Sequence, residues 1–305
     1  MKKPDTTSWG SVATWYDDML KDPDSYQKNV LMPNLIRIVA PKKGMAIVDL
    51  ACGQGYFSRA FAENGADVTA YDISRELIDL AKMREDKEKA EAVKNEPTPT
   101  SSSKASERKA KPSINKEVQK GRGKLSFHVS PADSIPFIAH GTVDAVTIIL
   151  ALQNIENMSD VIAECARVLK PGGRLILVMN HPAFRIAQSS SWGWDEQKEI
   201  GISKDGKIEN GEVKMYRRID SYMSDKTLSI DMTPGEKDPK KKTFTVSFHR
   251  PLQSYFKALN KSGLAVTRLE EWISHKKSQK GPRGAEEDRM RKEIPMFVCL
   301  EAKKV

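Results

Sequence analysis

One segment organises the rest of this sequence, and it reads Val48-Asp-Leu-Ala-Cys-Gly-Gln-Gly-Tyr-Phe57. The apolar run at residues 46–50 predicts a β-strand, and the glycines after it predict a tight turn into a helix. Small residues in such a turn let a ligand approach the backbone, and the start of the helix presents free N–H groups. The segment therefore predicts a strand, turn and helix that together bind a ligand.

Around this segment, short apolar runs alternate with helical patterns over residues 41–179, which is typical of a parallel sheet covered by helices. The expected strands cover residues 46–50, 67–71, 125–129, 143–150 and 174–179. A helical stripe at residues 252–259 and two more strand-like runs, 264–273 and 294–302, follow later in the chain. The fold class predicted is α/β, with a Rossmann-like seven-stranded, mostly parallel sheet that carries helices on both faces.

The remaining segments suggest additions to this core. Strand-like patterns at 213–222, 227–232 and 243–248 are separated by Gly, Asp, Pro and Lys clusters, and they predict a β-rich cap. The expected organisation is an N-terminal helical lid (1–40), a ligand-binding core (41–182 and 252–305), a disordered basic insertion (86–123) and a substrate cap (183–251). Within that insertion, alternating Lys and Glu up to residue 94 could still continue a helix.

Charge and composition exclude several classes of protein. The net charge is +9, and residues 84–124 carry twelve Lys or Arg against seven Asp or Glu, so much of the excess lies in the expected insertion. A second basic run covers residues 275–292. The sequence has no run of eighteen apolar residues, so no membrane span is predicted. Its first residues include no apolar segment of the kind found in secretory signals, so a cytoplasmic location is expected. Three widely spaced cysteines predict reduced thiols and no metal site.

Three acidic residues stand at the ends of successive expected strands. Asp49 precedes the glycine turn, where it would repel a pyrophosphate but attract a cationic group. Asp72 ends the second strand, where a carboxylate can accept hydrogen bonds from two ribose hydroxyls. Asp133 follows the third strand. This pattern indicates a ligand that carries both a nucleoside and a positive charge.

Four segments together resemble the class I S-adenosylmethionine-dependent methyltransferases, and among them the type 11 branch. These segments are Asp49-Leu-Ala-Cys-Gly-Gln-Gly55, Tyr71-Asp-Ile-Ser74, Ala132-Asp-Ser-Ile-Pro-Phe137 and Leu169-Lys-Pro-Gly-Gly-Arg-Leu175. In addition, Ala151-Leu-Gln-Asn-Ile155 is similar to the segment after the fourth strand in quinone-biosynthesis methyltransferases. The resemblance implies transfer of a methyl group from S-adenosyl-L-methionine, with S-adenosyl-L-homocysteine as the product.

The resemblance also implies which residues contact this cofactor. The methionine part would lie on Asp49 and the turn, the ribose on Asp72, and the adenine amine on Asp133 and Ser134. The full expected set is Tyr16, Asp49, Ala51, Cys52, Gly53, Gly55, Asp72, Ile73, Asp133, Ser134 and Leu150. Ala51 stands where the family more often has glycine, which should narrow the turn.

Methyl transfer from a sulfonium is an in-line displacement, so the protein mainly has to align the reactants and exclude water. A base is needed only if the acceptor is a hydroxyl, a protonated amine or an acidic carbon, and histidine is the natural candidate. His181, after the fifth expected strand, is the first choice, and His249, where the cap rejoins the core, is the second. His128, inside a strand, is expected to be structural.

Substrate recognition is expected from the cap and the lid, because the cofactor occupies the nucleotide side. Aromatic side chains of the cap could form a wall for a planar substrate, and arginines could bind an anionic substituent. The candidates are Gln153, Asn154, Arg185, Trp192, Arg218 and Arg250, with Trp194, Tyr216, Arg217, Tyr222 and Phe248 as further possibilities.

Several functions remain open at this point. The first is a methyltransferase for a small aromatic, quinone-like or carboxylated metabolite. The second is an RNA or protein methyltransferase, which the basic segments favour and the lack of an RNA-binding module disfavours. A third is a cofactor-binding interaction protein without catalysis. A dehydrogenase is the weakest choice, because Asp49 and Ser58 both disfavour pyrophosphate binding at the turn.

Overall fold

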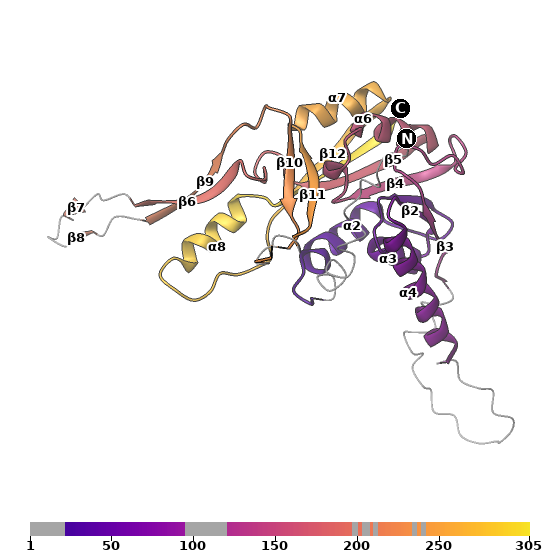
Figure 1. Cartoon of the computed structure of the whole chain (residues 1–305), viewed down its shortest axis with the longest axis horizontal. Helices are drawn as coiled ribbons and strands as arrows, with labels where there is room; N and C mark the ends of the chain where they lie inside the picture. The colour runs from indigo at the N-terminus through magenta and orange to yellow at the C-terminus, as the bar shows by residue number, and fades with distance from the viewer. Residues whose placement is uncertain are drawn as a thin grey trace, which may run out of the picture.

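The computed structural model describes residues 22–94, 121–196, 201–202, 208–209, 213–233, 237–238 and 242–305. A central sheet of seven strands forms the core of the described chain (Figure 1). Its strands, in chain order, are β1 (Ala46–Leu50), β2 (Asp67–Asp72), β3 (Leu125–Val129), β4 (Val143–Ile149), β5 (Leu169–Asn180), β12 (Leu264–Trp272) and β13 (Phe297–Lys304).

The order of the strands across the sheet is β12-β13-β5-β4-β1-β2-β3. Neighbours pair in parallel, except that β13 runs antiparallel to both β5 and β12. The predicted seven-stranded, mostly parallel α/β sheet is therefore confirmed. Several strand ends differ by one or two residues, and two starts differ by more: β5 begins at Leu169, directly after a helix, and β13 begins at Phe297, because Ile294 still caps the helix before it.

Helices cover both faces of the sheet, as predicted. One face packs against α6 (Met158–Val168) and α7 (Leu252–Lys261), around a core that includes Val146 and Ile148 of β4. The opposite face packs against α2 (Met32–Val39) and α3 (Tyr56–Glu63), and α4 (Arg75–Lys94) covers β2 and β3. Because successive residues of a strand point to opposite faces, β4 supplies apolar side chains to both cores.

The region before β1 contains helix, as expected for part of the lid. A short π-helical turn, η2 (Gln27–Leu31), leads directly into α2, whose first turn contains Pro33. Proline is tolerated there because the first N–H groups of a helix have no intrahelical partner. Residues 1–21, with Tyr16, lie outside the described part of the chain.

The expected insertion between β2 and β3 is shorter than its predicted bounds of 86–123. Helix α4 continues to Lys94, where Lys–Glu pairs four residues apart, such as Lys87 with Glu91, support its outer turns. At the other end, Gly123 donates a backbone hydrogen bond to Ala62, and Arg122 forms an ion pair with Glu85. The remaining residues of that prediction, 95–120, lie outside the described residues.

The segment after β5 is rich in β-strands, in line with the expected cap. Its strands form three two-stranded antiparallel pairs, β6 with β9, β7 with β8, and β10 with β11. Figure 1 shows the β6–β9 ribbon extending away from the sheet, with β7 and β8 at its far end. The bounds are β6 (Ser190–Glu196), β7 (Gly201–Ile202), β8 (Ile208–Glu209), β9 (Val213–Ile219), β10 (Lys226–Asp231) and β11 (Phe244–His249).

Helix α8 (Gly284–Glu293) lies within the second basic run, where the sequence did not predict an element. Its sequence lacks a repeating apolar stripe, and Met290 is its one buried residue. Instead, Glu286 accepts a hydrogen bond from the backbone N–H of Met215 in β9, so α8 is attached to the cap by polar contacts. Helical periodicity could not reveal such a helix, because little of its surface is buried.

One half-buried arginine ties α2 to the far strands of the sheet. The guanidinium of Arg174 donates to the backbone carbonyls of Ile38 and Val39, at 3.0 and 2.8 Å, and to the carboxylate of Glu301 at 2.9 Å. These carbonyls belong to the last turn of α2, where intrahelical partners are missing. Arg174 therefore caps the helix and fixes it to β5 and β13.

We predict that Arg174→Met lowers the free energy of unfolding by about 1 to 3 kcal/mol, because two helix carbonyls lose their donor. Urea denaturation of the full chain measures this change. Arg37→Met is the matched control, since Arg37 is half-exposed and pairs with Glu270 at the surface. Its loss should stay below about 1 kcal/mol. Equal losses in the two variants would contradict the capping role.

Candidate functional site

The candidate site lies along one edge of the sheet. Strands β1, β2, β4 and β5 are parallel, so their carboxyl ends meet at the same edge, which is where open α/β sheets bind ligands. Strand β12 ends at this edge too, because it runs parallel to β5 across the intervening antiparallel β13. The cap, α8 and the loop with the glycine turn all follow strands that end here.

The glycine turn after β1 has the strained backbone that its sequence predicts. Ala51, Gly53 and Gly55 have φ angles of 52°, 58° and 76°, all in the left-handed region. A Cβ atom at Gly55 would lie 2.4 Å from the ring of Phe127, so a side chain there would displace that ring. Ala51 adopts the left-handed conformation despite its Cβ atom, in a position where glycine would avoid strain.

Asp49 lies beneath the turn and is fully buried. One carboxylate oxygen accepts a hydrogen bond from Ser58 of α3 at 2.5 Å, and the other from Thr147 of β4 at 2.7 Å. Burial raises the pKa of Asp49 to about 6, although both hydroxyl donors favour the charged form. Asp49 therefore joins the turn, α3 and β4, and its contact with the methionine part of a cofactor remains a prediction.

Asp72 closes the turn from the neighbouring strand. Its carboxylate accepts the backbone N–H of Gly53 at 2.8 Å and that of Ser74 at 2.9 Å, one on each oxygen. Burial raises the pKa of this carboxyl, while the backbone donors oppose the shift. A carboxylate has about four acceptor positions, so Asp72 can accept a further donor beside these backbone groups. This arrangement fits a ribose with two hydroxyls.

The residues expected around an adenine ring lie on loops beside Asp72. Ser130 donates its backbone N–H to the carbonyl of Asp72, which places the loop after β3 next to the end of β2. In that loop, Asp133 is half-buried and accepts a hydrogen bond from Asn157. Ile73 is 49% exposed, so a large apolar side chain is available for a flat ligand. Ser134 is exposed, and Leu150 has a left-handed backbone at the end of β4.

Gln54, at the centre of the turn, did not appear among the expected site residues. Its side chain is completely buried, and neither amide atom has a hydrogen-bond partner among the described residues. A buried amide without partners is unfavourable by about 1 to 3 kcal/mol. Such an orphaned group in a left-handed turn fits a ligand with amino and carboxylate groups nearby, which the methionine part of S-adenosylmethionine has.

His181 makes contacts that suit a structural role. Its Nδ1 accepts the backbone N–H of Ala183 at 3.2 Å, and its Nε2 therefore donates to Glu271 at 2.7 Å. The imidazole is buried, which lowers its pKa, although Glu271 opposes this shift. With both ring nitrogens engaged, the structure leaves His181 no lone pair for a proton from an acceptor.

His249, at the end of β11, differs in this respect. Its Nε2 donates to the backbone carbonyl of Tyr222 at 2.8 Å, which leaves Nδ1 unprotonated. Among the described residues no donor binds that Nδ1. Strand β11 packs over the segment after β4, where Ser247 donates to the carbonyl of Gln153. His249 thus lies near the carboxyl edge with one nitrogen available as a base.

Most of the expected substrate residues are engaged in the fold. Arg250 donates to the backbone carbonyls of Ile155 and Glu156 and lies over the ring of Phe248. Gln153 donates to the carbonyl of Leu150, and its Oε1 is buried without a partner among the described residues. Asn154 is half-buried in η3 (Leu152–Asn154), and Arg218 is exposed on β9.

Two of the expected substrate residues do meet. The guanidinium of Arg185 lies over the indole ring of Trp192, 5.7 Å from its centroid, and that of Arg217 lies 4.9 Å from the same centroid. Arg217 stands opposite Trp192 in the β6–β9 pair, so both side chains lie on one face of the ribbon. The structure therefore brings Arg185, Trp192 and Arg217 together and leaves Arg218 and Arg250 apart from them.

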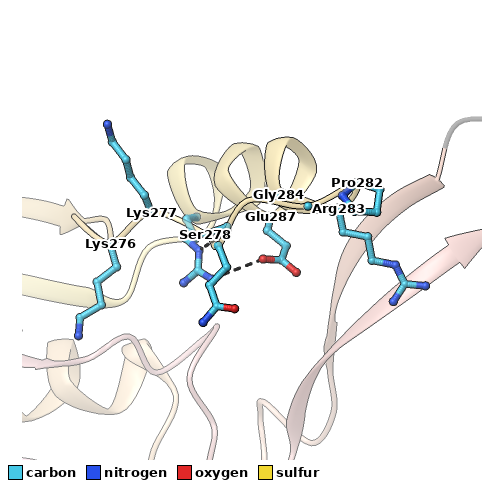
Figure 2. A pocket seen from close by; sticks show the side chains of 10 residues that line it. Lys276, Lys277, Ser278, Pro282, Arg283, Gly284 and Glu287 are labelled. Atoms are coloured by element: carbon cyan, nitrogen blue, oxygen red, sulfur yellow. Dashed lines mark hydrogen bonds and ion pairs between the residues drawn. The ribbon is translucent and has the colours of Figure 1, made fainter.

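A groove beside α8 contains much of the second basic run. Figure 2 shows Lys276, Lys277, Arg283 and Glu287 around it. Several of its cations already have protein contacts: Lys276 lies 3.5 Å from a carboxylate oxygen of Asp24, and Arg283 lies over the ring of Trp194. Arg291 also donates to Ser278 and pairs with Glu287. These contacts stabilise the loop before α8.

The described residues contain no group of three or more His, Cys, Asp or Glu side chains that could hold a metal ion. Within the same residues, no helix is both long and apolar enough to span a membrane.

The raised pKa of Asp49 predicts how stability depends on pH. In the folded chain this carboxyl binds its proton more tightly than in the unfolded chain, so its contribution to stability is present at low pH and lost as pH rises to about 6. Asp49→Asn keeps a polar partner for both hydroxyls without a charge. The wild type should therefore lose stability as the pH rises from 4 to 7, and Asp49→Asn should not. We predict that the difference in free energy of unfolding changes in favour of Asp49→Asn by up to about 3 kcal/mol over this range.

Denaturation in urea across this pH range measures the difference. Asp144→Asn is the control on the same sheet, because burial raises the pKa of Asp144 less than its hydrogen bonds from Lys170 and the Ala46 N–H lower it. That variant should lose stability relative to the wild type as the pH rises. A difference for Asp49→Asn that stays constant with pH would refute the prediction.

Comparisons with known proteins agree with this geometry. A family model described as a methyltransferase domain matches residues 24–209. The chain is 26% identical over 191 residues to a demethylmenaquinone methyltransferase of Renibacterium salmoninarum, covering 60% of this chain and 62% of that protein. It is 27% identical over 161 residues to a ubiquinone biosynthesis O-methyltransferase of Xanthomonas oryzae, covering 51% of this chain and 54% of that protein. The chain thus spans less than two thirds of these relatives.

Solved structures support the fold. An S-adenosylmethionine-dependent methyltransferase from Mesorhizobium loti superposes with a TM-score of 0.56 at 20% identity, over 92% of this chain and 98% of that one. The likeness confirms the expected class I sheet. Because the family model covers more than half of the sequence, the chain belongs to the family of S-adenosylmethionine-dependent methyltransferase domains.

Proposed function

We propose that this chain transfers a methyl group from S-adenosylmethionine to a small-molecule acceptor. The observation that carries the proposal is the Asp72 carboxylate, which accepts the backbone N–H groups of Gly53 and Ser74 on its two oxygens and, as a carboxylate, can accept further donors. A ribose diol is the natural partner for such a pair of sites. The named relatives methylate small molecules, which supports an acceptor of that kind.

The cofactor would supply an electrophilic methyl group on a positively charged sulfur. The acceptor's electron pair forms the new bond to carbon, the C–S pair stays with sulfur, and any acceptor proton leaves to a base. The chain's own contribution is to align the acceptor with that methyl group and to exclude water. The glycine turn, Asp72 and the loop of Asp133 would fix the cofactor, and the cap would fix the acceptor.

His249 is the residue we propose as the base for acceptors that must lose a proton. Its Nε2 is held by the carbonyl of Tyr222, so its Nδ1 carries the lone pair. His181, the first choice from the sequence, is held at both nitrogens and is proposed to position the loop after β5. The two roles differ in the availability of a lone pair.

A nucleic-acid substrate is less well supported. The basic groove beside α8 is the described feature that favours it, but two of its cations already pair with carboxylates, Lys276 with Asp24 and Arg291 with Glu287. Phosphate binding would need cations that remain available to the ligand. We therefore place the small-molecule acceptor first.

Asp72→Asn tests the cofactor site. The amide can accept on one atom only, so we expect binding of S-adenosylhomocysteine to weaken by about 1 to 3 kcal/mol in calorimetric titration. Asp67→Asn, at the other end of the same strand, is the control, because Asp67 accepts a hydrogen bond from Lys124 far from the turn. Unchanged affinity in Asp72→Asn would remove the carboxylate from the site.

His249→Gln tests the base. Glutamine can still donate to the Tyr222 carbonyl, but it has no basic nitrogen, so turnover of a phenolic acceptor should fall by about 100-fold or more. The assay measures S-adenosylhomocysteine release with a panel of simple phenols.

His181→Gln is the matched control, since its amide can keep the contact with Glu271. We expect it to retain turnover within a few-fold. If His181→Gln loses turnover and His249→Gln keeps it, the two roles are exchanged.

A further inference from the structure

Arg185, Arg217 and Trp192 form a cluster that the fold alone does not explain. The two guanidiniums lie 5.7 and 4.9 Å from the centroid of one indole ring. All three side chains are half-buried, so solvent and small ligands can reach them. We call Arg185 and Arg217 the arginine pair. Contact with an indole ring stabilises a guanidinium, but it does not neutralise its charge.

No carboxylate of the described residues forms an ion pair with either arginine. The Nε atom of Arg185 is buried and has no hydrogen-bond partner there. Burial lowers the pKa of both guanidiniums, and Arg185 lowers that of Arg217 further. Two arginines of α8, by contrast, do form ion pairs: Arg289 pairs with Glu286, and Arg291 pairs with Glu287 and Asp288. The arginine pair is therefore a concentration of positive charge without a counter-ion in the described chain.

The cluster is held rigidly at the ligand-binding edge of the sheet. Arg217 donates through Nε to the carbonyl of Phe184 at 3.0 Å and through one terminal nitrogen to Ser190 at 2.6 Å. These contacts fix the base of the β6–β9 ribbon to the loop after β5. The loop starts where β5 ends, beside β4 and the segment after β4 that Ser247 of β11 contacts. An acceptor bound at this edge can therefore reach the arginine pair.

We propose that Arg185 and Arg217 bind a carboxylate group of the methyl acceptor, which makes the substrate an organic acid. This inference rests on the proposed methyltransferase function and names the substrate class of the same site. The planar guanidinium of Arg185 is free to bind both oxygens of a carboxylate, and the remaining terminal nitrogen of Arg217 can donate a third hydrogen bond. Trp192 holds the two cations at a fixed spacing before the ligand arrives.

A carboxylate bound between Arg185 and Arg217 would supply the counter-ion that the arginine pair lacks among the described residues. Positioning of this kind raises the rate only if the reacting atom is placed at the methyl group.

The test measures binding of a carboxylate and its neutral analogue to the full chain saturated with S-adenosylhomocysteine. Benzoate and benzamide form the matched pair of probes, with phenyl phosphate as a third arm, and calorimetry measures each affinity. We expect the wild type to bind benzoate about tenfold or more tightly than benzamide, and Arg185→Met to abolish this difference. Quenching of tryptophan fluorescence by benzoate should disappear in Trp192→Phe.

Arg218→Met is the control, because Arg218 is the next residue of β9 and alternation along the strand turns its side chain to the other face. It should keep the preference for benzoate, and Arg185→Lys should keep part of it. The inference is overturned if benzamide binds as tightly as benzoate, if phenyl phosphate binds more tightly than benzoate, or if Arg185→Met keeps the wild-type preference.

The cofactor readout separates this inference from the proposed function. If S-adenosylhomocysteine binds to the wild type and to Arg185→Met but benzoate is not preferred, the acid site is wrong and the methyltransferase site stands. If S-adenosylhomocysteine does not bind to the wild type, the proposed function itself fails.

Discussion

A buried carboxylate organises the ligand-binding edge of this protein. Asp49 lies below the glycine turn and joins α3 to β4 through the hydroxyls of Ser58 and Thr147. Removing a carboxylate from water is unfavourable, which is why burial raises its pKa to about 6. The fold nevertheless buries this carboxylate, because its two oxygens hold the turn against α3 and β4 at once. Asp72, on the neighbouring strand, then fixes the same turn from the side that faces a ligand.

Some polar side chains of the site have all their hydrogen-bond or ion-pair partners within the protein, and others have an atom left without a partner. His181 and Arg291 have their hydrogen-bond or charge requirements met within the chain, whereas Arg250 binds two backbone carbonyls through one terminal nitrogen and has its other one buried without a partner among the described residues. His249 and Arg185 also have a nitrogen without a partner among the described residues. Buried polar groups in proteins are generally paired, so the exceptions are where ligands and protons are handled. This distinction separates positioning residues from candidates for contact with the reactants.

Three additions to the core lie at its carboxyl edge. The cap follows β5, α8 follows β12, and the π-helical turn η2 lies before β1 and contacts the same region through Tyr26 and Ser274. A rigid sheet with variable segments at one edge allows one cofactor site to serve different acceptors. The arginine pair belongs to this variable part, since Arg217 is in the cap and Arg185 is in the loop that leads to it.

The sheet and the cofactor motifs could be predicted from the sequence, because both depend on local patterns. These patterns are apolar runs of strand length, glycines at a tight turn, and acids at strand ends. The sequence could not determine α8, whose polar surface has no periodic apolar stripe. Nor could it separate four candidate arginines, because their roles depend on which carbonyls, rings and carboxylates lie within reach. Only the tertiary structure decided that Arg250 caps backbone carbonyls while Arg185 and Arg217 share Trp192, since residues far apart in sequence make those contacts.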